Sequence, residues 1–311
     1  LGPIFGAPPA SGTFGGAVSA NLSGAARINR GALRDSLIGV KGVNGRGEAI
    51  APGGRVMKNV TGYDLVKLLA GSFGTLSALT EATVKVLPEA EAEATLVLRG
   101  LDDRAGVTAL AQGLSSPYDL TGAAHLPEAA AMRMLGGAGA ASILRLENFQ
   151  DSIAYRAGEL SRDLGRLGSI EILETEASRA LWAGLRRIAP LGAEGDDRLI
   201  WRLSVAPTDG PAILAEAAAM GGEGWLDWGG GLAWLAIPAA GLADGGAARL
   251  RGAITRAGSG HATLIRGPET LRAAIDVFEP QPEPLAALSA RIKESFDPDR
   301  ILNPGRMTAG V

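Results

Sequence analysis

The spacing of hydrophobic positions changes along the chain, and the first ~88 residues alternate short β-like runs with Gly-rich turns. Apolar residues over 36–43 predict a strand, and 44–48 predict a tight turn. Residues 48–56 then predict the returning strand of a hairpin. The beginning of the chain is therefore expected to build a small sheet.

The next segment, KNVTGYDLVKLLAGSFGTLSALTEATVKVLP over 58–88, predicts a helix followed by a strand. Three leucines at 65, 68 and 69 share a helical face, Thr61 with Asp64 resembles a capping box, and Gly71 supplies a stop. In 81–86, the apolar positions 82, 84 and 86 alternate with polar ones, which predicts a half-buried strand ended by Pro88.

From about residue 89 the elements become longer, and strands and helices alternate. Residues 94–100, 199–205 and 231–238 read as strands. Three amphipathic helical faces are expected, carrying Ile153, Ala157, Leu160, Leu164 and Leu167; Leu181, Leu185 and Ile188; and Leu285, Leu288, Ile292 and Phe296. A Pro-punctuated loop, 296–307, follows the last helix, and no internal repeat is evident. This pattern predicts an α+β fold with a mainly antiparallel sheet.

Composition narrows the possible chemistry. A net charge of −3 gives no basic field for nucleic acid. The absence of cysteine excludes thiolate nucleophiles, disulfides, Cys-ligated zinc and iron–sulfur clusters, so electron chemistry requires a bound cofactor. The apolar run 229–243 is too short to span a bilayer and contains Pro238, so we expect it in the core. No signal peptide is visible, and the first residue is Leu.

Two Gly-rich segments are candidate ligand loops. Adjacent Gly15 and Gly16 in 11–24 would let a backbone approach a diphosphate or sugar, although in a chain this rich in glycine an ordinary tight turn is the expected reading of the segment taken alone. The segment is not GxGxxG, so a Rossmann site is not supported. The Gly71–Thr75 turn suits a nucleoside or ring edge, because it follows a helix C-terminus, or it is a plain helix-to-strand connector.

No catalytic constellation is visible. The two histidines, His125 and His261, form no paired metal motif, and a structural role is expected for both, with His125 at the end of an element. Trp225, Trp228 and Trp234 could line a pocket for a flat ligand, but core packing is the expected use. Asp227 lies between them.

Several segments, in order over nearly the whole chain, resemble the FAD-linked oxidases of the vanillyl-alcohol oxidase / p-cresol methylhydroxylase (PCMH) type. The matching segments are GTFGGAVSANLSG, RDSLIGVKGVNGRGE, the 58–88 stretch and FDPDRILNPGRM. Within this family, NLSGAAR, VMKNVTGYDL, LDWGGGLAWL and GHATLIRG are similar to the FAD-binding E subunits of glycolate oxidases.

The resemblance implies a domain division and a set of cofactor-binding residues. It implies the second part of a PCMH-type FAD-binding domain at 1–88, an α+β cap domain at 89–280, and a helix with an NPG tail at 281–311 that returns to the FAD domain. By position, the implied FAD-binding residues are Gly15, Gly16, Ala20, Asn21, Gly24, Gly71, Ser72, Gly74, Thr75, Leu76, Leu79 and Asn303.

The chain departs from the family pattern in three ways. Ser77-Ala78-Leu79 replaces a Gly-Val-Ile segment, and the His-rich metal and substrate motif of the catalytic relatives is missing. The sequence also begins downstream of the family's Gly-rich pyrophosphate loop. The resemblance therefore implies an N-terminally truncated chain in which FAD binding is weakened or lost, with no metal and no assigned catalytic residue.

The function implied is that of an FAD-binding subunit of a glycolate oxidase-like, 2-hydroxy acid dehydrogenase complex, inactive alone. The flavin would be held non-covalently. The implied partners are a second flavoprotein subunit and an iron–sulfur subunit, in the cytoplasm and reaching a membrane only through those partners. Two alternatives stay open: a non-catalytic scaffold subunit that keeps the oxidase fold for assembly, and a self-sufficient flavin oxidase of another small alcohol.

Overall fold

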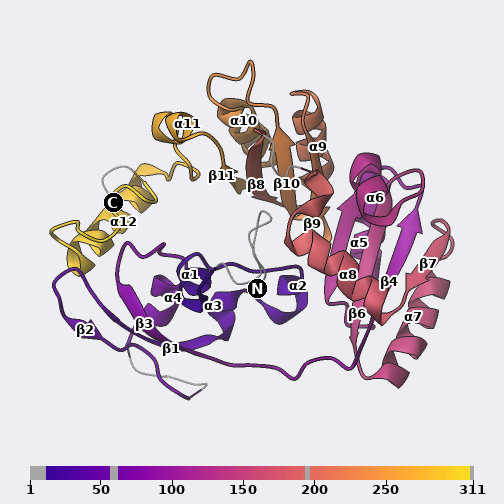
Figure 1. Cartoon of the computed structure of the whole chain (residues 1–311), viewed down its shortest axis with the longest axis horizontal. Helices are drawn as coiled ribbons and strands as arrows, with labels where there is room; N and C mark the ends of the chain where they lie inside the picture. The colour runs from indigo at the N-terminus through magenta and orange to yellow at the C-terminus, as the bar shows by residue number, and fades with distance from the viewer. Residues whose placement is uncertain (1–11, 57–61, 193–196, 309–311) are drawn as a thin grey trace.

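The computed structural model describes residues 12–56, 62–192 and 197–308, and it contains two antiparallel sheets (Figure 1). The small sheet has the order β2-β1-β3 and comprises β1 (Leu37–Val43), β2 (Ala49–Ile50) and β3 (Ala78–Val84). Around it lie α1 (Phe14–Ser19), α3 (Leu33–Ser36) and α4 (Leu65–Leu69), whereas α2 (Arg27–Arg30) lies against the large sheet. The predicted hairpin is confirmed, since Val43 pairs with Ala49 across the 44–48 turn, but its returning strand is only the two residues of β2 and does not extend over 48–56.

The large sheet has eight strands in the order β11-β8-β10-β9-β5-β6-β4-β7, and every pair is antiparallel. Its strands are β4 (Ala92–Arg99), β5 (Gly122–Leu126), β6 (Ala141–Asn148), β7 (Ile170–Leu173), β8 (Leu199–Val205), β9 (Glu223–Asp227), β10 (Leu232–Ile237) and β11 (Gly260–Arg266). The expected α+β fold with a mainly antiparallel sheet is thus confirmed.

The large sheet is a duplication in topology that the sequence did not reveal. Apart from an extra helix at Glu128–Leu135 between β5 and β6, β4-α5-β5-β6-α7-β7 and β8-α9-β9-β10-α10-β11 both follow a β-α-β-β-α-β path. Both halves arrange their strands in the same order. The helices are α5 (Asp103–Leu114), α7 (Gln150–Leu164), α9 (Gly210–Ala218) and α10 (Ala247–Ala257). The halves join where β5 meets β9, through His125 and Leu226.

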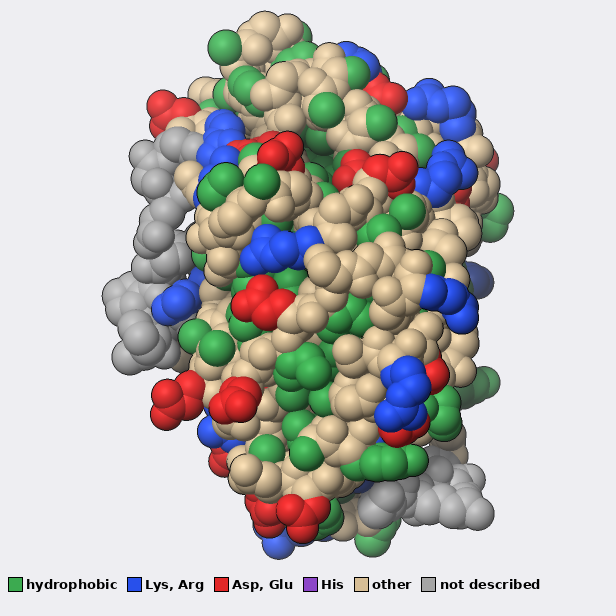
Figure 2. All heavy atoms as spheres, turned by 90° about the vertical axis from the view of Figure 1, so that its right-hand side faces the viewer, with side chains coloured by type: hydrophobic (Ala, Val, Ile, Leu, Met, Phe, Trp, Pro, Cys, Tyr) green, Lys and Arg blue, Asp and Glu red, His purple; other side chains and the backbone are tan. Residues whose placement is uncertain are grey.

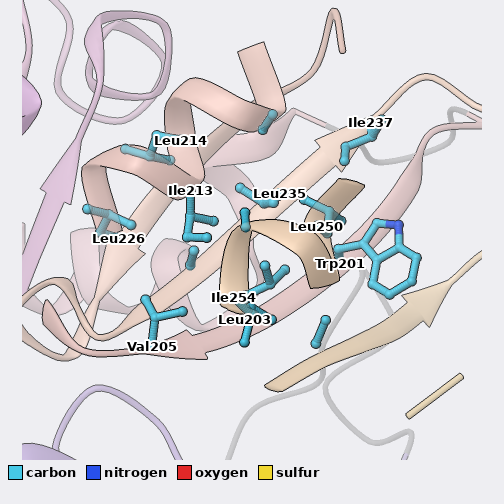
Figure 3. Packing of buried hydrophobic residues seen from close by; sticks show 14 of the residues in the cluster. Trp201, Leu203, Val205, Ile213, Leu214, Leu226, Leu235, Ile237, Leu250 and Ile254 are labelled. Carbon is cyan, nitrogen blue, oxygen red and sulfur yellow. The ribbon is translucent and has the colours of Figure 1, made fainter. Parts of the chain in front are cut away.

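Alternation along each strand separates two layers of core. In β8, Leu199, Trp201, Leu203 and Val205 pack against α9 and α10 (Figure 3), as the alternation predicted. Ile200, Arg202 and Ser204 point to the other face. In the first half that other face is covered by α6 (Glu128–Leu135), α8 (Thr175–Arg186) and the 3₁₀ turn η1 (Ala189–Leu191). The second half contributes no helix to this face, because α9 and α10 both lie opposite.

The remaining elements lie in connections and at the C-terminus. They are the 3₁₀ turns η2 (Pro207–Asp209) and η3 (Trp228–Gly230), α11 (Glu269–Ala274) and α12 (Glu283–Phe296). Among the described residues, no helix is both long and apolar enough to cross a membrane. The apolar 229–243 run supplies β10, which is fully buried. On the outer face shown in Figure 2, acidic and basic side chains are interspersed.

Three details of the predicted elements need correction. β3 ends at Val84, and Val86 is 79% exposed, because its partner β1 begins at Leu37 and offers no strand residue beyond Val84. Ile188 lies past the end of α8, in a left-handed conformation, and Leu167 lies past the end of α7. α4 is capped by Asp64, whose carboxylate accepts from the Lys67 N–H; Thr61 lies outside the described residues.

α12 forms as predicted, but its apolar face is only half used. Leu285 and Leu288 are exposed, whereas Ile292 and Phe296 pack against the core of the small sheet. The fully buried side chain of this helix is Lys293. The division into parts at residues 88 and 280 stays a prediction.

Replacing Trp201 by Ala tests the core beneath α9 and α10. The indole is fully buried and its Nε1 donates to the Gly245 carbonyl at 3.0 Å, so we expect a loss of about 3–5 kcal/mol in the free energy of unfolding. Urea denaturation measures this loss. The control Leu285→Ala, on the exposed half of α12, should change it by less than ~0.5 kcal/mol; equal losses would contradict the assignment of core and surface.

Candidate functional site

The turn after α4 is a run of left-handed residues. Gly71, Phe73 and Gly74 have φ of 87°, 52° and 70°, a conformation that glycine adopts without a steric cost. Two hydroxyls brace the turn: Ser72 Oγ donates to the Leu69 carbonyl at 2.9 Å, and Thr75 Oγ1 donates to the Ser72 carbonyl at 2.7 Å. Both hydroxyls are buried, so a ligand here would meet backbone groups of Ser72 and Thr75.

The end of α1 docks on this turn. The Gly71 N–H donates to the Val18 carbonyl at 3.1 Å, and the Phe73 N–H donates to the Ser19 carbonyl at 2.8 Å. Ala20 caps α1, and Asn21 follows with a φ of 48°. A Cβ at Gly71 would lie 3.3 Å from Asn21 Cβ, so the two segments are in close contact.

Gly15 and Gly16 lie in a helix, whereas a loop was expected. They lie inside α1, whose N-cap Thr13 accepts from the Gly16 N–H at 2.9 Å, and not in a loop. The helix forms because Thr13 provides the cap. Asn21 Oδ1 is also occupied, since it accepts from the Arg34 N–H at 3.0 Å.

The C-terminal tail completes the assembly. Asn303, with a φ of 43°, donates from Nδ2 to the Phe73 carbonyl at 2.8 Å. A Cβ at Gly74 would lie 2.8 Å from the same Nδ2, closer than Cβ atoms tolerate. The structure therefore brings together three segments predicted to act together: 20–21, 71–75 and 303. We call these three segments the cradle.

A buried ion pair locks the tail to the turn. Lys293 Nζ donates to Asp297 Oδ2 at 2.6 Å, to the Thr75 carbonyl at 2.7 Å and to the Leu302 carbonyl at 2.9 Å. The side chains of Lys293 and Asp297 are at most 1% exposed. All three ammonium donors are thus used. Sequence reasoning missed this pair, although a Lys and an Asp four residues apart on one helix face just before the NPG tail signal it.

The Asp297 carboxylate also organises the tail directly. It accepts from the backbone N–H groups of Ile301 at 3.1 Å and Leu302 at 2.8 Å. Burial alone would raise the pKa of Asp297, but the hydrogen bonds from Lys293, Leu302 and Ile301 together lower it below its usual value. A Cβ at Gly45 would collide with this carboxylate, so the hairpin turn of the small sheet closes over it.

The remaining predicted residues lie beside the cradle. The Leu76 side chain is buried in the small core, and Leu79 sits in β3 opposite Gly42. The Gly24 carbonyl accepts from Trp228 Nε1 at 3.2 Å. The N–H groups of Gly24 and Gly74 donate to no described residue, and a Cβ at Gly24 would meet nothing within 4 Å. Free amides and open space of this kind fit the polar backbone of a dinucleotide cofactor.

A second cluster forms at the start of η3. Trp225 and Trp234 are buried in the core, as expected, but Trp228 is only half-buried. The guanidinium carbons of Arg27 and Arg202 lie 4.4 Å and 5.1 Å from the centre of the Trp228 ring. Arg202 also lies 5.8 Å from the Trp234 ring centre. We call Arg27, Trp228 and Arg202 the arginine–tryptophan stack.

Asp227, one residue before Trp228, is an unusual acid. It is buried and accepts from the Trp228 N–H at 2.7 Å. Burial raises its pKa to about 7, and the hydrogen bond and the charges of Arg145 and Arg202 only partly oppose this. The sequence marked it only as an acid between tryptophans, because burial depends on tertiary packing.

The two histidines differ in role. His125, next to last in β5, is fully buried, with Nδ1 2.9 Å from Ser142 Oγ and Nε2 3.0 Å from Asp103 Oδ1. His261 lies at the start of β11, where desolvation and then Arg202 lower its pKa. In the described part of the chain, no three His, Asp or Glu side chains are placed to hold a metal ion.

Comparisons with known proteins give the family context. No protein-family model matches the chain. The chain is 32% identical to glycolate oxidase subunit GlcE of Escherichia coli (strain K12) over 297 residues, 96% of this chain and 72% of that protein. It is 42% identical to glycolate oxidase subunit GlcD of Bacillus subtilis (strain 168) over 85 residues, 27% of this chain and 18% of that one.

A solved structure shares the fold. An alkyldihydroxyacetonephosphate synthase superposes with a TM-score of 0.62 at 15% identity, over 94% of this chain. This chain spans 58% of the length of that protein. At such low identity the likeness concerns the fold alone.

Replacing Lys293 by Met tests the locking pair. The substitution leaves the Asp297 charge buried without its partner, so we expect a loss of about 3–5 kcal/mol in the free energy of unfolding. The double variant Lys293→Met/Asp297→Asn should be less destabilised than the single one, since no charge stays unpaired. Urea denaturation compares them with Lys85→Met, an exposed control expected within ~0.5 kcal/mol of the parent. A single variant no worse than this control would refute the role of the pair.

Replacing Asp227 by Asn tests the raised pKa. The folded-state pKa of about 7 lies above the unfolded value, so the folded state binds the proton more tightly and its stability falls as pH rises from ~4 through 7. A shift of this size corresponds to ~4 kcal/mol at most. Because Asn stays neutral, the stability of the variant relative to the parent should rise from pH 5 to pH 8. Denaturation at both pH values measures this, and a difference independent of pH would contradict it.

Proposed function

Because the chain belongs to the family of FAD-linked oxidoreductases that includes glycolate oxidase subunit GlcE, we propose that it is an FAD-binding subunit of a glycolate oxidase-like complex. The observation that carries this proposal is the cradle, in which three distant segments meet. The Gly71 and Phe73 N–H groups donate to carbonyls of α1, and the Asn303 side chain donates to the Phe73 carbonyl. A connector with no ligand would not need five left-handed residues at one meeting point.

The cofactor would be held by backbone groups. The Gly24 and Gly74 N–H groups are free to donate, and the Gly71–Leu76 turn and the Asn303 segment would border the ligand. When bound, FAD would supply the two-electron acceptor that the side chains of this protein lack. Attachment would be non-covalent, since the chain has no cysteine and His125 is enclosed within the large sheet.

The substrate class and the assembly are part of the same proposal. The names of the GlcE and GlcD relatives identify them as subunits of a glycolate oxidase, which supports a 2-hydroxy acid as electron donor and a second flavoprotein subunit as partner. We extend the proposal to an iron–sulfur subunit, to a cytoplasmic location with membrane contact only through partners, and to inactivity of the isolated chain. The remaining site assignments, Gly15, Gly16, Leu76 and Leu79, stand as predictions.

A scaffold subunit without redox turnover is the second candidate. The observation that favours it is that the polar side chains of the cradle, Ser72, Thr75 and Asn21, already bond within the protein. Such a segment could serve only to hold the fold together. FAD binding separates the two candidates, because a scaffold has no reason to retain it.

Fluorescence titration of FAD into the full chain tests the proposal, with Gly74→Ala as the informative variant. The added Cβ would displace Asn303, so we expect at least ~10-fold weaker binding, equivalent to about 1.4 kcal/mol.

The matched control is Gly47→Ala, in the hairpin turn. Its φ of 75° imposes a similar backbone cost, but a Cβ there meets nothing within 4 Å. It should bind FAD as the parent does. Equal weakening in both variants would show that backbone strain alone is measured, and absence of binding by the parent would favour the scaffold.

A further inference from the structure

Two arginines of the arginine–tryptophan stack lack a charged partner. No described carboxylate lies within 4.0 Å of the Arg27 or Arg202 guanidinium, and neither group makes a hydrogen bond with a described residue. Other arginines nearby are paired: Arg30 meets Glu147 at 3.2 Å, and Arg145 donates to Thr121. The stack is thus an exception among its neighbours.

Keeping these cations together has an electrostatic cost. Desolvation and, after it, the charge of Arg27 lower the pKa of Arg202 to about 10, against the opposing charge of Asp227. Arg202 and Arg27 also lower the pKa of His261, which Glu279 opposes. The cluster therefore has excess positive charge, and a bound anion would relieve it.

The stack lies on the large sheet. Arg202 points from β8 to the face that no helix of the second half covers, between Trp234 on β10 and Thr263 on β11. Arg27 reaches the same indole from α2, which contacts β5 and η3. Trp228 is fixed by its bond to the Gly24 carbonyl, which lies in the predicted flavin segment.

We propose that Arg27 and Arg202, oriented by Trp228, bind the carboxylate of a small organic acid. Stacking on an indole fixes the plane of a guanidinium and leaves its edge N–H groups free, and two such donors match the two oxygens of a carboxylate. This inference rests on the proposed function, for which it supplies a substrate-carboxylate site next to the predicted flavin segment. Arg27 comes from α2 and Arg202 from β8, so the site exists only when both elements are in place.

The test uses His261 as a reporter in the flavin-free full chain. The chain has two histidines, and the fully buried His125 serves as an internal folding reference in an NMR titration of the imidazoles. Glycolate is the probe, and chloride at matched ionic strength is the blank. A bound carboxylate should raise the pKa of His261 in a saturable way, because it opposes Arg202 and Arg27.

Charge-removing variants locate the site. Arg202→Gln and the exposed Arg27→Gln should each weaken glycolate binding at least ~10-fold, about 1.4 kcal/mol. Arg104→Gln, exposed on α5 against the opposite face of the sheet, removes the same charge and should bind as the parent does. An unchanged His125 signal shows that each variant is folded.

Three outcomes would overturn the proposal: no saturable shift beyond that in chloride, a shift that survives both arginine variants, or an equal shift with inorganic phosphate. Because no flavin is present, failure here leaves the FAD proposal standing. Conversely, glycolate binding in a chain that does not bind FAD would refute only the proposed function.

Discussion

The buried pair of Lys293 and Asp297 is the contact on which the cradle depends. Its three ammonium hydrogen bonds join α12, the Thr75 carbonyl and the start of the NPG tail, while the Asp297 carboxylate orders Ile301 and Leu302. Lys293 and Thr75 lie 218 residues apart in sequence, so no local propensity holds the tail against the turn. A buried ion pair is stable only when every donor and acceptor is satisfied, and this one meets that requirement.

The other contacts of the site continue from this ion pair. Asn303 donates to the Phe73 carbonyl, and the turn that contains Phe73 donates to carbonyls at the end of α1. The segment after α1 contacts the large sheet, because the Gly24 carbonyl accepts from Trp228. The two halves of the large sheet differ in how its inner face is covered. Helices α6 and α8 cover the inner face of its first half, whereas the second half presents Arg202 there. The predicted cofactor segment and the arginine–tryptophan stack thereby become neighbours in space.

Much of the fold could be predicted from the sequence, because periodic burial is a local property. The alternation in β8 and the spacing of Ile153, Ala157 and Leu160 in α7 identified their buried faces. The ends of elements could not be predicted from spacing. β3 ends at the residue that pairs with the first residue of β1, and the leucines in the N-terminal half of α12 are exposed. The duplication escaped notice because it lies in strand order, which residue spacing does not encode.

For the site, the resemblance identified segments that lie together in the structure. It did not predict the hydrogen bonds within those segments. Gly15 and Gly16 belong to a capped helix, and the Ser72 and Thr75 hydroxyls serve the turn itself. Lys293, Arg202 and Asp227 were missed, since their burial and partners come only from tertiary packing.

The central claim is that three distant segments form one flavin cradle, and hydrogen–deuterium exchange of the full chain with and without FAD tests it most directly. The account predicts slower exchange on adding FAD in peptides covering 20–24, 71–76 and 302–306 together, with the α9–α10 core unchanged. Unaltered exchange in all three, or protection confined to another region, would contradict it.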